Sequence, residues 1–154
     1  MRQIFQPNPS PTPSQLLTIA DRRYRDAVAL VATGNNERAV GAAYLAGYVV
    51  EILLKRQLLL KYHSLASRKD RSSLPGNVVR LFWFSHNLEA MLDELTDVRE
   101  TLRIASLRSR VNYLSDLEQM LSWSPFARYS PHSATMADAR QLLERVNELR
   151  KVLR

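Results

Sequence analysis

The longest apolar stretch of the chain runs from Ala39 to Tyr62 and predicts one long buried helix. Its first charged residue is Glu51, and apolar residues recur along it at steps of three and four, which is helical spacing. Lys55 follows Glu51 by one helical turn. An ionised carboxylate in so apolar a helix is costly unless it is paired, so we expect Lys55 to be its partner.

The residues before this stretch predict an extended arm followed by an amphipathic helix. Residues 1–12 are rich in proline, which excludes a regular helix there. Thr12 and Gln15 then have the spacing of a capping box at a helix start. We expect a helix from Pro13 to about Thr33 and assign residues 13–154 to one helical domain.

The residues after the central helix predict loops and three further helices. A Ser-rich charged loop is expected at 64–77 and an irregular aromatic loop at 123–131. The apolar run 78–84 has no partner strand elsewhere, so it predicts a helical turn or an extended segment packed on the bundle. The chain as a whole predicts an all-α fold, an antiparallel bundle of four to five helices. The three later helices are expected from Ser85 or His86 onward, from Val98 to about Leu121 with Asp97 as cap, and from Ala134 to about Leu153 with Ser133 as cap.

Composition indicates a globular protein with an excess of basic residues. The 154 residues suffice for a core within one domain, and the absence of cysteine excludes disulfides and thiolate chemistry. The formal net charge of +7 at pH 7 favours polyanionic partners such as nucleotides or nucleic acid. No secretion signal is recognised, and the uncharged run is shorter than the ~20 residues that span a bilayer. We expect a soluble, cytoplasmic protein that does not enter a membrane.

The common catalytic and metal-binding motifs are absent from the sequence. The three histidines, His63, His86 and His132, lie far apart and have no metal-ligand spacing. With only four glycines, the chain contains neither a GxSxG turn nor a glycine-rich phosphate loop. We expect no metal and no cofactor.

Five polar residues remain as candidates for ligand binding, and we predict that they line one cleft. Glu51 and Lys55 could instead form a structural pair at the rim of the core. His86 could cap or pack at a helix start. Arg128 and Tyr129 could pair with Glu51, contact a ligand, or tie a loop to the bundle.

Three sequence elements resemble the HEPN family, the helical domains named for higher eukaryotes and prokaryotes nucleotide-binding. They occur in the family's order, and the resemblance covers residues 16–153. The elements are Ala-Tyr-Leu-Ala-Gly-Tyr-x-x-Glu-x-x-Leu-Lys from Ala43 to Lys55, Ser-His-Asn-Leu from Ser85 to Leu88 followed by Leu92, and Ala-Arg-Tyr-x-Pro from Ala127 to Pro131.

The resemblance implies a bundle of four or five helices that forms a homodimer. It also implies a role in handling nucleotides or RNA, often beside a minimal nucleotidyltransferase in a toxin–antitoxin or phage-defence pair. We therefore expect a nucleotide- or RNA-binding protein with a nucleotidyltransferase as a partner. A purely structural protein-interaction bundle is an alternative.

A second alternative is a metal-independent ribonuclease. Many members of the family use an arginine followed, after four to six residues, by a histidine, which could move a proton while the arginine stabilises phosphorane charge. Five residues separate Arg80 from His86, but Leu81 follows the arginine where the family has a polar residue. Only three residues separate Arg128 from His132. The catalytic motif is therefore not cleanly present, and Arg80, His86 and His132 are its candidates.

Overall fold

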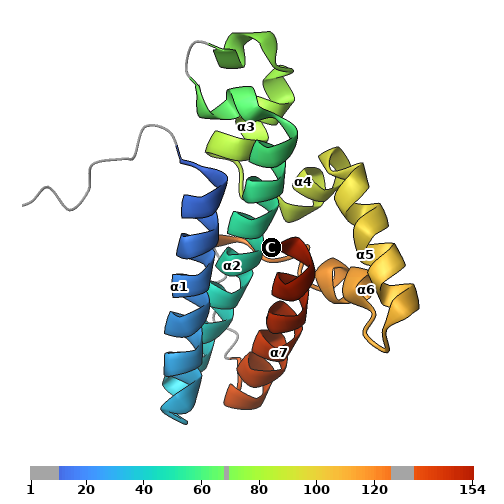
Figure 1. The fold of residues 1–154 in the computed structure, drawn as a ribbon. Coiled ribbons are helices and arrows are strands. Elements are labelled where there is room, and N and C mark those ends of the chain that lie inside the picture. Colours follow the sequence, from blue (N-terminus) through green and yellow to red (C-terminus); the bar gives the residue numbers. More distant parts are fainter. Residues whose placement is uncertain (1–10, 68–69, 126–133) are drawn as a thin grey trace, which may run out of the picture.

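In the residues that the computed structural model describes, 11–67, 70–125 and 134–154, all regular secondary structure is helical (Figure 1). Seven α-helices and three short 3-10 helices occur in these ranges, and no strand does. The all-α prediction is confirmed, whereas four to five helices is too low a number. The predicted arm lies outside the described residues except for its last two positions. Among the described helices, none has the length and apolarity needed to cross a membrane.

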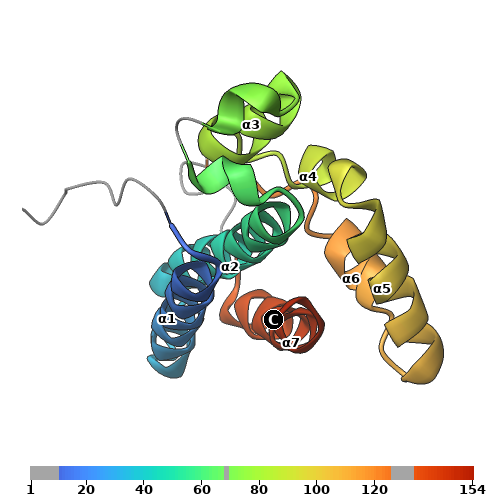
Figure 2. The ribbon, with the colours of Figure 1, turned by 45° about the horizontal axis from the view of Figure 1, so that its top comes forward.

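Helix α2 (Ala39–Lys61) is the centre of the fold, as its apolar pattern predicts. Twelve of its 23 residues are buried, including every position from Val49 to Leu54. Helices α1 (Pro13–Ala32) and α7 (Met136–Leu153) pack along it (Figures 1 and 2). Because neighbouring helices cover α2 on several sides, its buried residues are not confined to one face, as is typical of a core helix.

The direction of one of these three helices, α7, differs from the prediction. Helix α1 is antiparallel to α2, to which a short turn joins it (Figure 1). At the start of α2, the backbone N–H of Met136 donates to Asn36 Oδ1 at 3.0 Å. Near the other end, Gln57 Nε2 donates to the backbone oxygen of Leu153 at 2.8 Å. Helix α7 therefore runs parallel to α2, and a wholly antiparallel bundle is the wrong description.

The start of α1 forms as the sequence predicts. Thr12 Oγ1 accepts the backbone N–H of Gln15 at 3.1 Å, and Gln15 Oε1 accepts that of Thr12 at 2.9 Å. This capping box satisfies two backbone donors that the helix leaves free. Beyond the end of α1, Gly34 has a φ of +67°, a left-handed conformation that glycine adopts without strain. Asn35 then caps the 3-10 helix η1 (Asn36–Arg38).

The middle of the chain is more broken than the periodicity predicts. The helix expected from Val98 to Leu121 is two helices, because Ser109 Oγ bonds to the backbone of Val111 and Asn112 caps a new helix. Leu95 rather than Asp97 precedes the first of them. The expected loop 64–77 contains two 3-10 helices, and the run 78–84 is helical. The elements are η2 (His63–Ala66), η3 (Asp70–Ser73), α3 (Gly76–Phe84), α4 (Leu88–Glu94), α5 (Thr96–Arg108) and α6 (Tyr113–Glu118).

The final helix starts two residues later than predicted. Thr135, not Ser133, is its cap, and its hydroxyl accepts the backbone N–H of Asp138 at 3.2 Å. Asp138 Oδ2 in turn accepts the backbone N–H of Thr135 at 2.8 Å. Thr135 and Asp138 therefore form a second capping box, which the sequence prediction misses.

Gly47 in α2 provides the flat surface on which Trp123 lies. A Cβ atom at Gly47 would stand 2.1 Å from Trp123 Cδ1, well inside van der Waals contact. The indole ring also packs against Tyr44 and Tyr48, with ring centroids 5.9 and 6.5 Å away. By contrast, a Cβ atom at Gly41 would lie 3.5 Å from Leu30 Cδ1, an ordinary contact. The two glycines of α2 therefore have different roles.

We predict that Gly47→Ala lowers the free energy of unfolding by about 1–3 kcal/mol, because the added methyl group displaces Trp123. Gly41→Ala is the matched control and should raise the free energy of unfolding by about 0.5–1 kcal/mol, because alanine favours the helix. Urea denaturation followed by circular dichroism measures both. Equal effects of the two substitutions would contradict the close contact between Gly47 and Trp123.

Candidate functional site

The candidate site is built around Glu51, whose side chain is only 1% exposed. In the described part of the chain it is the one buried charged residue. Helix α2 carries Glu51 and Lys55 on one face, and Lys55 Nζ lies 2.8 Å from Glu51 Oε1. His86 Nδ1 lies 3.0 Å from both carboxylate oxygens. An ammonium group and an imidazole thus offset the cost of burying the carboxylate.

His86 belongs to a three-residue segment, 85–87, that joins α3 to α4. Ser85 Oγ accepts the backbone N–H of Asn87 at 3.0 Å. Asn87 Oδ1 caps α4 by accepting the backbone N–H of Ala90 at 2.9 Å. Hydrogen bonds on both sides of His86 therefore hold the segment in a shape that brings the imidazole to the buried carboxylate.

The contact with Glu51 orients the His86 ring. An ionised carboxylate only accepts hydrogen bonds, so Nδ1 of His86 carries the hydrogen between them. The His86 side chain is 52% exposed, which leaves Nε2 for contact with a ligand or with water. Nε2 accepts a hydrogen bond when the ring is neutral and donates one when the ring is protonated. An imidazole held in this way suits both anion binding and proton transfer.

His86 lines a pocket of about 440 Å³ between the end of α3 and the chain that follows α6. Two aromatic side chains form part of the wall, Trp123 and Phe84, of which Phe84 is 77% exposed. Ser122 and Ser124 add hydroxyl groups. A pocket of this size and lining can hold a flat ring against an aromatic wall while His86 contacts a polar group.

The aromatic wall continues onto α2, one helical turn before Glu51. Tyr48 packs there against Tyr44 and Trp123. Burial raises the pKa of the Tyr48 hydroxyl above its ordinary value of 10.0, and the negative charge of Glu51 raises it further. Tyr48 is therefore uncharged at neutral pH, and the wall beside the carboxylate stays suited to packing against a ring.

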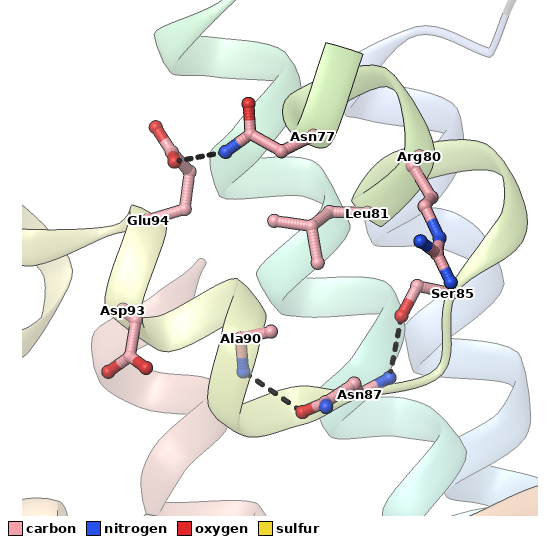
Figure 3. A pocket seen from close by; sticks show the side chains of 8 residues that line it. All are labelled: Asn77, Arg80, Leu81, Ser85, Asn87, Ala90, Asp93 and Glu94. Atoms are coloured by element: carbon pink, nitrogen blue, oxygen red, sulfur yellow. Dashed lines mark hydrogen bonds between the residues drawn. The ribbon is translucent and has the colours of Figure 1, made fainter. Parts of the chain in front are cut away.

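A second pocket, of about 470 Å³, lies between α3 and α4 (Figure 3). Ser85 and Asn87 line both pockets, whereas His86 lines the first and Arg80 the second. The two members of the Arg80–His86 pair therefore border different spaces on the same segment. Their side chains do not converge on one pocket, as a pair acting on a single phosphate would.

The structure brings together three of the five predicted ligand-binding residues, Glu51, Lys55 and His86. Arg80, one of the catalytic candidates, lies in the neighbouring pocket. The other predicted residues, Arg128, Tyr129 and His132, are outside the described residues. In the described ranges, no group of three or more His, Asp or Glu side chains could hold a metal ion.

Several residues of the two pockets were not identified from the sequence. Asn87 could have been recognised as a helix cap, because it precedes a short amphipathic run. Trp123 and Phe84 carried no such indication, since an aromatic residue in a loop or at a helix end more often packs in the core. Their place beside His86 follows from the tertiary structure.

We predict that Glu51→Gln lowers the free energy of unfolding by about 1–3 kcal/mol, because it removes the charge that Lys55 and His86 contact. Glu148→Gln is the matched control, since Glu148 forms an i,i+3 pair with the exposed Lys151, and it should cost less than about 1 kcal/mol. Urea denaturation measures both values. A Glu51 substitution no more costly than the control would show that the buried carboxylate does not hold the site together.

Comparison of this chain with protein-family models, with curated proteins and with solved structures found no match. The resemblance to the HEPN family therefore rests on the three sequence elements. Two of these elements contribute the residues that meet in the site: the central helix carries Glu51 and Lys55, and the Ser-His-Asn-Leu element carries His86. The function of the chain has to be inferred from this geometry.

Proposed function

We propose that this protein is a HEPN-like nucleotide- or RNA-binding protein whose ligand occupies the pocket beside His86. The observation that carries the proposal is the buried Glu51, which holds the imidazole of His86 at a pocket with an aromatic wall. A nucleotide unit offers the matching groups, a flat base for Trp123 and a phosphate for the imidazole. The formal net charge of +7 also attracts an anionic ligand to the protein as a whole.

The proposal includes the partners that the HEPN resemblance implies. They are a second copy of the chain, forming a homodimer, and a nucleotidyltransferase in a toxin–antitoxin or defence pair. Large apolar side chains at the surface, Phe84 and Leu107, are 77% and 74% exposed and offer contact area to such partners. Phe84 also borders the His86 pocket, so a partner at this position would contact the candidate site.

A binding measurement with matched histidine variants tests the proposal. We expect AMP or a labelled single-stranded oligoribonucleotide to bind, with an affinity for the oligonucleotide that falls as salt rises. His86→Gln should weaken binding about tenfold or more, the usual effect of losing a hydrogen bond to a charged group. His63→Gln, an exposed histidine outside the pocket, should leave affinity unchanged. Fluorescence anisotropy and calorimetry measure these constants.

The binding proposal fails if neither probe binds at low salt. It also fails if His63→Gln weakens binding as much as His86→Gln does. Circular dichroism of both variants establishes that each remains folded. Arg128→Ala adds a second test, because the sequence predicts that Arg128 contacts the ligand.

A metal-independent ribonuclease is the second candidate function, and the Glu51–His86 contact favours it. A carboxylate that orients an imidazole through Nδ1 leaves Nε2 to take a proton from, or give one to, a reacting oxygen. Arg80 does not line the same pocket, so stabilisation of phosphorane charge would have to come from another cation. Lys55 Nζ lies 2.8 Å from Glu51 Oε1, its side chain is 16% exposed, and it is the cation that shares the Glu51 carboxylate with His86.

Incubation of single-stranded RNA with the purified protein in a metal chelator tests the ribonuclease. If it is one, the wild type should cleave, and His86→Ala should reduce the rate by about 10²–10⁴-fold, the range for loss of a general acid or base. His63→Ala should cleave at the wild-type rate. Intact RNA after prolonged incubation with the wild type would exclude this function while leaving the binding proposal in place.

A further inference from the structure

The pocket between α3 and α4 has one end that offers hydrogen-bond donors and another that offers acceptors (Figure 3). We propose that it binds a sugar phosphate, with the phosphate at Arg80, Ser85 and Asn87 and the sugar hydroxyls at Glu94. This assignment is independent of the proposed function. Only the identification of the sugar phosphate as a unit of an RNA backbone rests on the proposed function.

Three side chains at one end of the pocket have donors to spare. Arg80 is exposed and makes no ion pair with any residue in the described ranges. Ser85 Oγ accepts the backbone N–H of Asn87, which leaves its O–H to donate. Asn87 Oδ1 accepts the backbone N–H of Ala90, so the cap fixes the orientation of the amide and leaves its NH₂ group free to donate. A guanidinium, a hydroxyl and an amide NH₂ together suit an oxyanion.

Glu94 supplies acceptors at the opposite end of the pocket. Its Oε1 accepts the hydroxyl of Tyr62 at 2.5 Å, and its Oε2 accepts Asn77 Nδ2 at 3.4 Å. The hydrogen bond to Glu94 raises the pKa of the Tyr62 hydroxyl above its ordinary value, as expected beside a carboxylate. A carboxylate has room for about four hydrogen bonds, so Glu94 can accept further hydroxyl groups from a ligand.

The charges of the pocket determine which way such a ligand lies. Glu94 and Asp93 would repel a phosphate, which therefore belongs at Arg80. Asp93 is paired with the Arg99 guanidinium at 2.7 Å, whereas Glu94 accepts from the neutral Tyr62 and Asn77 side chains and has Lys61 Nζ 4.0 Å from Oε1, so we assign the sugar hydroxyls to Glu94. A purely anionic ligand would not fit both ends, whereas a phosphate joined to a polyol would.

The middle of the pocket is apolar. Leu81 and Ala90 lie between the donor end and the acceptor end (Figure 3). They offer a surface to the C–H face of a sugar ring. The volume of about 470 Å³ is within the range of small-ligand sites.

The position of this pocket connects it to the His86 site. Ser85 and Asn87 line both pockets, with His86 between them in the sequence. Two successive units of an RNA strand could therefore contact the two sides of one segment, one through Arg80 and one through His86. A free sugar phosphate would occupy the Arg80 side alone.

Calorimetry of the full chain with ribose 5-phosphate, inorganic phosphate and ribose tests the assignment. We expect ribose 5-phosphate to bind more tightly than either fragment. Arg80→Gln should weaken its binding about tenfold or more, the effect of losing a charge-assisted contact. Arg108→Gln, an exposed arginine of α5 outside the pocket, is the control and should leave affinity unchanged. Glu94→Gln should reduce the advantage of ribose 5-phosphate over inorganic phosphate.

A short oligoribonucleotide and the matching oligodeoxyribonucleotide distinguish the two sources of the sugar phosphate. If the source is RNA, Arg80→Gln weakens the binding of both strands, whereas Glu94→Gln weakens the oligoribonucleotide more than the deoxy strand, because Glu94 can accept the 2′-hydroxyl. If the source is a free sugar phosphate, Arg80→Gln affects ribose 5-phosphate alone. Either result supports the sugar-phosphate site.

Two results would overturn the assignment. One is no binding of ribose 5-phosphate at millimolar concentration, and the other is an equal effect of Arg80→Gln and Arg108→Gln. RNA binding that depends on His86 but not on Arg80, without any ribose 5-phosphate binding, would overturn this assignment and leave the proposed function standing. If ribose 5-phosphate binds but neither RNA nor a nucleotide binds at His86, the proposed function fails and the sugar-phosphate assignment stands.

Discussion

The burial of the Glu51 carboxylate determines how helix α2 and segment 85–87 come together in the candidate site. Glu51 lies in the buried part of helix α2, where an unpaired negative charge would cost several kcal/mol. Lys55 supplies part of the compensation from the same helix. His86 supplies the rest from a segment 35 residues away, and so ties the α3–α4 connection to the central helix. The fold and the site therefore depend on the same contact.

This contact fixes a short connecting segment to the central helix. Segment 85–87 has no regular structure, yet each of its side chains makes a defined hydrogen bond, to Glu51 or to a neighbouring backbone group. Short segments held this way can present functional groups with little loss of entropy on binding. A pocket borders the segment on the side of Trp123, and another borders it on the side of Arg80.

Much of the fold could be predicted because its causes are local. The apolar run of α2 and the capping box at Thr12 act through neighbouring residues, and both form as expected. The sequence prediction is wrong where a distant contact or a weak local preference decides where a helix ends or which way it runs. The break between α5 and α6 depends on Ser109 and Asn112, polar residues that are also tolerated within a helix. The parallel direction of α7 depends on which ends of α2 it meets, and periodicity carries no information about that.

The sequence by itself determined that Glu51 needs a cationic partner and that Lys55 stands one turn away, because helical spacing and the cost of a buried charge are both local. It also pointed to His86 through the family resemblance. Only the tertiary structure showed that the His86 imidazole contacts the Glu51 carboxylate and that Trp123 packs on Gly47. It also showed that Arg80 and His86 line different pockets. The physical reason is that such contacts join residues far apart in the chain, and their geometry follows from how the helices pack rather than from any spacing along the sequence.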